Sequence, residues 1–129
     1  MRYDVCRMRL ELLKSKIHRA HITGKNVDYE GSLTIDRELM EAAGIHNYEK
    51  VQVVNVHNGS RLETYAIPGQ SRSGEVVLNG AAARWGEIGD PVIILAFAHV
   101  EESKLASFQP KIVWLDAQNS IKAKEPSVR

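Results

Sequence analysis

Cysteine is nearly absent from this chain of 129 residues, in which Cys6 stands alone. A single cysteine can form no internal disulfide and no cysteine metal cluster, so we expect no metal site of that kind. Charge of either sign is not in excess, because 17 Lys and Arg face 16 Asp and Glu for a net charge of +1. Without a basic field, neither nucleic acid nor an anionic membrane is an expected partner.

Long apolar runs are also missing, and none approaches the ~20 residues that span a bilayer. The chain does not start with the basic and apolar segments of a secretory signal. We therefore expect a cytoplasmic protein. Its 43% hydrophobic and 26% charged residues are typical of a globular chain, and its length predicts one domain over residues 1–129.

Turn residues divide the chain into seven or eight short β-rich runs and two or three short helices, without a βαβ rhythm. This order predicts a small, mostly β barrel or sandwich with short inserted helices. Residues 91–98 form an apolar run that predicts a strand buried on both faces. Residues 24–26 are typical of a turn, and residues 27–29 predict a short strand.

Residues 10–22 predict a strand, with a helix as the alternative for residues 10–14. Strict alternation would place the odd-numbered residues from Ile17 on one face and the even-numbered residues from His18 on the other. His18 and His21 would then point apart, which makes them a poor zinc pair.

Several polar residues occupy positions typical of helix ends and turns. Asp36 is predicted to cap a helix that ends at Gly44, because its carboxylate can accept the free N–H groups of the first turn. Asn58-Gly59 predicts a tight hairpin between two strands. Asn79 is predicted to cap a further helical turn over residues 79–83.

The dipeptide Gly31-Ser32 joins two predicted strands. Gly31 offers a carbonyl that no Cβ shields, and the Ser32 hydroxyl can turn back onto it. Because that attack is intramolecular, proximity can supply several kcal/mol of the barrier. Gly59-Ser60 repeats the dipeptide in a predicted turn, so the pair alone does not distinguish self-cleavage from an ordinary turn.

Blocks spread from Met8 to Asn119 resemble, in their order, the bacterial aspartate α-decarboxylases, which make β-alanine for pantothenate and coenzyme A. The blocks are Lys16-Ile17-His18-Arg19-Ala20, Tyr29-Glu30-Gly31-Ser32, Ile35-Asp36 with Ala42-Ala43-Gly44-Ile45, Asn55-Val56-His57-Asn58-Gly59-Ser60-Arg61, Thr64-Tyr65-Ala66-Ile67, Asn79-Gly80-Ala81-Ala82-Ala83, and residues 86–94. The resemblance implies a double-psi β-barrel, assembled as a homotetramer with active sites at subunit contacts.

The resemblance also implies that the chain is a zymogen that cuts itself between Gly31 and Ser32. Ser32 would attack the Gly31 carbonyl to give an ester, and β-elimination and hydrolysis would convert Ser32 into a covalent pyruvoyl group. Fragments 1–31 and 32–129 would result, and a maturation factor is possible. The pyruvoyl group would form a Schiff base with L-aspartate and take up the electrons left by carbon dioxide, without metal or pyridoxal phosphate.

Two neighbouring residues match catalytic positions of the family. Tyr65 matches the proton donor to the carbanion, and a phenol is protonated at neutral pH, which suits that role. Thr64 matches the residue that donates a hydrogen bond to the Gly31 carbonyl oxygen during cleavage. A tyrosine and a β-branched residue in a strand are, without the resemblance, equally well explained as ordinary strand residues.

Other positions match substrate-binding residues. Arg61 and Lys16 match the cations that hold a substrate carboxylate, although a lone cation is usually a solvated surface charge. Asn79 matches a polar residue near the cofactor, and the turn Gly80-Ala81-Ala82 matches a backbone segment that approaches substrate. Tyr29 and His18 match residues lining the site.

The sequence departs from the family at three places. Asp28 stands where many relatives have His, and Val54 where relatives often have an aromatic residue, so the pocket wall differs there. Residues 1–7 match nothing in the family, and Met8 is therefore a hypothetical natural start. Two other classes of function are alternatives: a non-catalytic barrel that binds a partner or small molecule, and a pyridoxal phosphate enzyme, for whose usual folds the chain is short.

Overall fold

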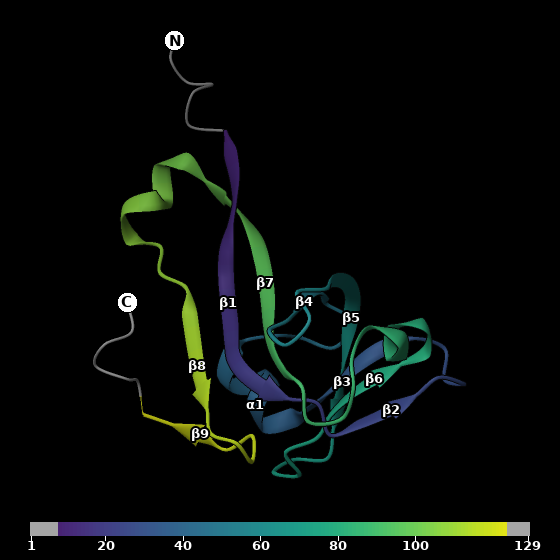
Figure 1. Ribbon diagram of the computed structural model, residues 1–129. Coiled ribbons are helices and arrows are strands. Elements are labelled where there is room, and N and C mark those ends of the chain that lie inside the picture. Colours follow the sequence, from purple (N-terminus) through teal and green to yellow (C-terminus); the bar gives the residue numbers. More distant parts are fainter. Residues whose placement is uncertain (1–7, 124–129) are drawn as a thin grey trace.

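The computed structural model describes residues 8–123. The hypothesis that the natural chain starts at Met8 concerns residues 1–7, which lie outside this range. Nine strands form one mixed sheet in the order β2-β6-β3-β5-β4-β7-β1-β8-β9 (Figure 1). The mostly β architecture with short inserted helices is thereby confirmed. The elements are β1 Arg9–His21, β2 Gly24–Asn26, β3 Ser32–Asp36, α1 Arg37–Ala43, β4 Lys50–Asn55, β5 Arg61–Gly69, β6 Val76–Asn79, the 3-10 helix η2 Gly80–Trp85, β7 Pro91–Glu101, the 3-10 helix η3 Glu102–Ser107, β8 Lys111–Leu115 and β9 Ile121–Lys122.

The sheet mixes parallel and antiparallel pairs of neighbouring strands. β3 pairs in parallel with β5 and antiparallel with β6, whereas β1 pairs in parallel with β8 and antiparallel with β7. Parallel pairs require crossover connections, so the chain passes from one region of the sheet to another between them. This places β3, β5 and β6, which are separated in sequence, side by side.

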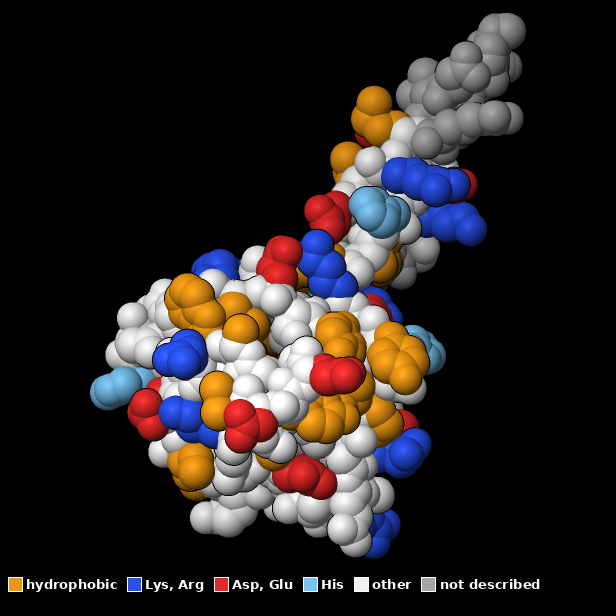
Figure 2. All heavy atoms as spheres, turned by 90° about the vertical axis from the view of Figure 1, so that its right-hand side faces the viewer, with side chains coloured by type: hydrophobic (Ala, Val, Ile, Leu, Met, Phe, Trp, Pro, Cys, Tyr) orange, Lys and Arg blue, Asp and Glu red, His pale blue; other side chains and the backbone are white. Residues whose placement is uncertain are grey.

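The longest strands, β1 and β7, extend beyond the rest of the sheet. Their outer halves pair from Arg9 with Glu101 to Leu13 with Phe97, and none of residues 9–14 is buried. Figure 1 shows the two strands rising together toward η3, and Figure 2 shows a narrow arm projecting from a broader body. Residues 10–14 are strand, so the helical alternative is wrong.

A β-bulge at Arg19 overturns the predicted faces of β1. Arg19 has a φ of 65°, and the register with β7 shifts between His18 and Ala20. The extra residue reverses the alternation, because two residues then stand opposite one residue of the partner. Ile17 and Ala20 are therefore both fully buried, although strict alternation placed them on opposite faces.

Other local predictions had mixed outcomes. Residues 24–26 form β2 rather than a turn, and residues 27–29 lie in a turn closed by a 3.2 Å bond from Tyr29 N to Asn26 O. β7 buries one face only, because Val92, Ile94 and Ala96 alternate with half-buried neighbours. Of the pair Asn58-Gly59, only Gly59 has a positive φ, so the turn is longer than a two-residue hairpin.

The predicted caps at both ends of α1 are confirmed. The Asp36 carboxylate accepts a 2.8 Å bond from Glu38 N, and Gly44 ends α1 in the left-handed conformation. Asp36 also accepts bonds from Arg72 N and Gly74 N, so one buried carboxylate fixes the end of β3 and the loop before β6. None of the helices within residues 8–123 is long and apolar enough to cross a membrane.

Candidate active site

The peptide bond between Gly31 and Ser32 lies between two residues with positive φ, +118° at Gly31 and +116° at Ser32. Glycine adopts such a conformation readily, whereas serine pays roughly 1–3 kcal/mol for a sparsely populated backbone region. Ser32 is fully buried at the first position of β3, where its neighbours hold it in place. The strain therefore falls directly on the bond that the sequence singled out.

Gly80 packs against this bond from β6 and η2. A Cβ atom added at Gly80 would lie 2.7 Å from both the nitrogen and the Cα of Gly31, and 2.9 Å from the Tyr29 carbonyl oxygen. All three are backbone atoms, which cannot swing aside as a side chain can. Gly80 also has a φ of 67°. Only glycine fits between η2 and the strained segment.

Asn79 holds the hydroxyl of Ser32. Its buried Nδ2 donates to Ser32 Oγ over 2.9 Å and to Thr34 Oγ1 over 2.8 Å. The predicted cap of the following helical turn is wrong, because the Asn79 side chain makes no capping bond to η2. Asn79 is paired with Ser32 across the β3–β6 ladder, and this pairing directs its amide toward β3 instead.

Tyr65 approaches the same bond from β5. Its hydroxyl donates a long hydrogen bond of 3.4 Å to the Gly31 carbonyl oxygen, and the side chain is 37% exposed. Its ring lies against Tyr48, with centroids 6.2 Å apart and planes tilted by 49°. The parallel pairing of Leu33 with Ala66 brings this part of β5 beside Ser32.

A pocket of about 220 Å³ opens at the Gly31-Ser32 bond. Six of the ten predicted site residues line it, namely Gly31, Ser32, Thr64, Asn79, Ala81 and Ala82. Glu30, Leu62, Glu63 and Trp85 complete the lining and were not predicted. Trp85 could have been suggested by the sequence, because it closes the helical turn that begins at Gly80.

The two predicted substrate cations, Arg61 and Lys16, are not among the residues that line this pocket. Arg61 begins β5 and donates a 2.8 Å bond to the Gln52 side chain. Lys16 lies on β1, which three strands (β7, β4 and β5) separate from β3 in the sheet. In a single copy of the chain, Lys16 does not line the pocket at the cleavage site.

Of the two residues expected to line the site, Tyr29 lies just before the cleavage site and His18 lies on β1 near Lys16. Burial lowers the pKa of His18 below its ordinary value, and the positive charges of Lys16, Arg19 and Lys122 lower it further. His18 Nδ1 is buried and has no hydrogen-bond partner among the described residues. Both effects favour the neutral imidazole over the charged one.

Comparison with known proteins agrees with this geometry. A model of the aspartate decarboxylase family matches residues 8–122. The aspartate 1-decarboxylase of Carboxydothermus hydrogenoformans is 55% identical over 122 residues, which cover 94% of this chain and 96% of the relative. Those of Caldicellulosiruptor saccharolyticus and Campylobacter jejuni are 55% and 54% identical, each covering 88% of this chain and 89% of the relative. The chain belongs to the aspartate decarboxylase family.

Proposed function

We propose that this chain, after cutting itself between Gly31 and Ser32, converts L-aspartate into β-alanine and carbon dioxide, as a step toward pantothenate and coenzyme A in the cytoplasm. The observation that carries the proposal, beside family membership, is the strained Gly31-Ser32 bond. Its carbonyl oxygen faces the Tyr65 hydroxyl, and its serine hydroxyl is held by Asn79. A non-catalytic binding module has no need of that arrangement.

Cleavage begins when Ser32 Oγ bonds to the Gly31 carbonyl carbon. The hydroxyl proton passes to the Ser32 nitrogen as the C–N bond breaks, which leaves an ester between Gly31 and the serine oxygen. Loss of the Ser32 α-proton then eliminates Gly31 as a carboxylate, and hydrolysis of the resulting imine releases ammonia. The products are fragment 1–31 and a fragment 32–129 that carries a pyruvoyl group.

The residues around the bond favour its first step. Negative charge develops on the Gly31 carbonyl oxygen, to which the Tyr65 hydroxyl already donates a bond. We assign Thr64, which lines the same pocket, as the second donor to that oxygen. Asn79 fixes the attacking oxygen, so little orientation is lost in reaching the transition state. Breaking the bond also releases the backbone strain at Ser32.

A pyruvoyl group at residue 32 supplies an electron-accepting carbonyl, without metal or pyridoxal phosphate. The site fits such a group, because Ser32 is buried and the adjoining pocket is walled by the small side chains of Ala81 and Ala82. Tyr65 delivers the proton that replaces carbon dioxide on the substrate α-carbon. Gly80, Ala81 and Ala82 present backbone close to the substrate.

Arg61 and Lys16 bind the side-chain carboxylate of aspartate, Arg61 as a bidentate partner and Lys16 as a point charge. Because Lys16 does not line the pocket of its own copy, we infer that a neighbouring copy provides it. This supports a homotetramer with active sites at subunit contacts. The parallel β3–β5 and β1–β8 pairs within a mixed sheet support a double-psi barrel of one domain.

Intact-mass analysis of purified protein tests the proposal. We expect two fragments divided after residue 31, a pyruvoyl mass at residue 32, and β-alanine released from L-aspartate. Ser32→Ala should stay whole and inactive, whereas Ser60→Ala, in the second Gly-Ser pair, should still be cut. A wild-type chain that stays whole on warming, both alone and with a host extract supplying any maturation factor, would refute the proposal.

A further inference from the structure

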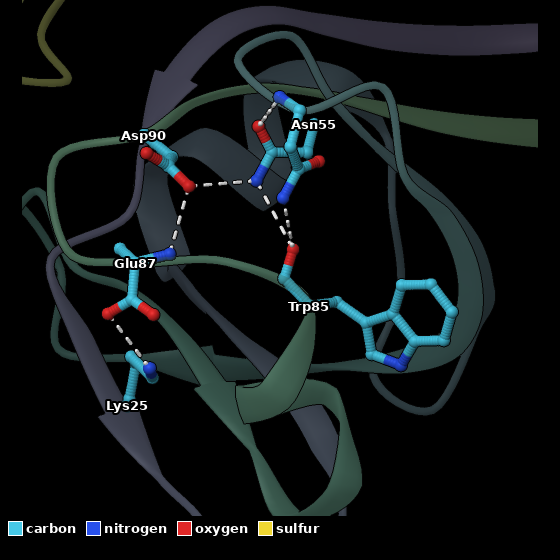
Figure 3. A network of polar contacts seen from close by, with 6 residues as sticks. Lys25, Asn55, Trp85, Glu87 and Asp90 are labelled. Atoms are coloured by element: carbon cyan, nitrogen blue, oxygen red, sulfur yellow. Dashed lines mark hydrogen bonds and ion pairs between the residues drawn. The ribbon is translucent and has the colours of Figure 1, made fainter.

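The Trp85 carbonyl, at the end of η2, receives three side-chain hydrogen bonds from one short segment. Asn55 Nδ2 donates over 3.2 Å, Ser60 Oγ over 3.1 Å and Asn58 Nδ2 over 3.4 Å. A backbone carbonyl has two lone pairs, so three donors converging on it mark an unusually constrained point. Figure 3 shows the Asn55 amide and the Trp85 carbonyl facing each other.

Asn55 is the centre of this network, and only 3% of its surface is exposed. Its Nδ2 also donates to Asp90 Oδ2 over 3.0 Å, and its Oδ1 accepts from His57 N over 2.8 Å and Asn58 N over 3.2 Å. Both the nitrogen and the oxygen of the Asn55 amide are therefore hydrogen-bonded. The arrangement orders the loop after β4 and fixes it to η2 at the same time.

Asp90 anchors the amide from the other side. Its Oδ2 also accepts a 2.9 Å bond from Glu87 N, just beyond η2 (Figure 3). The hydrogen bond from Asn55, followed by that from the Glu87 backbone, lowers the pKa of Asp90 below its ordinary value. The carboxylate is therefore ionised throughout the physiological range.

Gly86 allows the two segments to approach this closely. A Cβ atom at Gly86 would lie 3.0 Å from Asn55 Nδ2 and 3.2 Å from Leu78 Cδ1. The buried amide and a core side chain would both have to move. Gly86 is therefore part of the same network as Asn55 and Asp90, because only a glycine leaves room for the Asn55 amide.

The network joins two parts of the pocket that are distant in sequence. The loop that it orders ends at Ser60, immediately before Arg61, and η2 carries the pocket residues Ala81, Ala82 and Trp85. We propose that Asn55 and Asp90 are positioning residues for substrate binding, which fix Arg61 relative to the wall formed by η2. This inference rests on the proposed function of the pocket and of Arg61.

Such a role predicts an effect on substrate affinity more than on chemistry. Arg61 binds the non-reacting carboxylate in both the ground state and the transition state, so its displacement weakens uniform binding and raises KM. Tyr65 and Ser32 approach the bond from β5 and β3, outside the network. Self-cleavage and kcat should therefore change little.

Asn55→Asp is the informative variant, because it keeps the shape and the acceptor for His57 N but places a carboxylate against Asp90 and the Trp85 carbonyl. In matured enzyme we expect KM for L-aspartate to rise about tenfold with kcat within about threefold. Adding Asp90→Asn removes the like-charge contact and should lower KM again. No recovery in the double variant would contradict the coupling.

Asn119→Asp is the matched control. Asn119 is also 3% exposed, and its Nδ2 donates to the His21 and Gly74 carbonyl oxygens, away from the pocket. The same substitution there should lower the melting temperature and leave KM unchanged. If Asn55→Asp and Asn119→Asp have the same KM as wild type, Asn55 is merely structural and the inference is wrong.

A milder variant covers the case in which Asn55→Asp does not fold. Asn58→Ala with Ser60→Ala removes the two exposed donors to Trp85, and we expect KM to rise about threefold; an unchanged KM would overturn the inference.

Arg61→Ala separates this inference from the proposed site. If Arg61→Ala leaves KM unchanged, the assignment of Arg61 fails; if it raises KM while the network variants do not, only the positioning role fails.

Discussion

The Asn79 amide nitrogen bridges two hydroxyls of β3, Ser32 Oγ at 2.9 Å and Thr34 Oγ1 at 2.8 Å. The bridge is buried, and it holds the attacking oxygen of the proposed cleavage beside the bond to be broken. Thr34 keeps the amide in place without touching that bond. Asn79 and Thr34 therefore align the nucleophile, and Ser32 supplies it.

Asn79→Ala should slow self-cleavage by about tenfold, because the Ser32 hydroxyl loses the donor that orients it. The half-time of the uncut precursor on a denaturing gel measures the effect. Thr34→Val is the control, since it removes only the outer end of the bridge and should slow cleavage much less. Equal rates in wild type and Asn79→Ala would show that the bridge does not align the nucleophile.

Tyr65→Phe should leave self-cleavage largely intact and lower kcat by about 100-fold or more, because the substrate carbanion loses its proton donor. The hydrogen bond to the Gly31 carbonyl is long, at 3.4 Å, so its loss should affect cleavage only modestly. Tyr48→Phe keeps the ring that packs on Tyr65 and serves as control. Turnover by fully matured Tyr65→Phe at the wild-type rate would remove Tyr65 from the mechanism.

Gly80→Ala should block cleavage and leave the 129-residue precursor whole. The added Cβ would meet the Gly31 backbone at 2.7 Å, and backbone cannot yield without displacing the scissile bond. Gly59→Ala is a matched control, because Gly59 also has a positive φ but has nothing within 4 Å of an added Cβ. Both variants share the conformational strain, so only the collision distinguishes them. Normal cleavage of Gly80→Ala would contradict the packing.

Local signals explain which parts of the fold could be predicted. The cap at Asp36 and the left-handed Gly44 depend on a few neighbouring residues, and both were predicted correctly. The bulge at Arg19 depends on the register with β7, about 75 residues away along the chain. The alternation of residues within β1 alone does not predict it. Asn79 was misplaced as a helix cap for the same reason, because its partner Ser32 lies across the β3–β6 ladder.

In the site, too, features set by neighbouring residues were predicted and features set by strand pairing were not. Gly31 and Ser32 were identified from their family context, but the strain at Ser32 and its contact with Gly80 arise only when β6 pairs with β3. Asn55 and Asp90 carried no catalytic signature, because their effect passes through a backbone carbonyl. Sequence reasoning finds reactive groups more readily than the residues that hold them.

Acid should destabilise the folded chain through His18. Its pKa in the folded chain is lowered below the ordinary value of 6.5, first by burial and then by Lys16, Arg19 and Lys122. Between the lowered pKa and 6.5 the unfolded chain binds the proton and the folded chain does not, so folding stability falls as the pH decreases below 6.5. Above 6.5 the imidazole is neutral in both states, and this contribution is fully present.

His18→Gln should therefore reduce the loss of melting temperature on going from neutral to mildly acidic pH, since glutamine does not titrate. Lys122→Gln should act in the same direction but less strongly, because it removes one of the positive charges that oppose protonation of His18. Thermal melts of the three proteins across that range provide the measurement. If His18→Gln loses as much stability in acid as wild type, other groups dominate the titration and His18 is not held neutral by the fold.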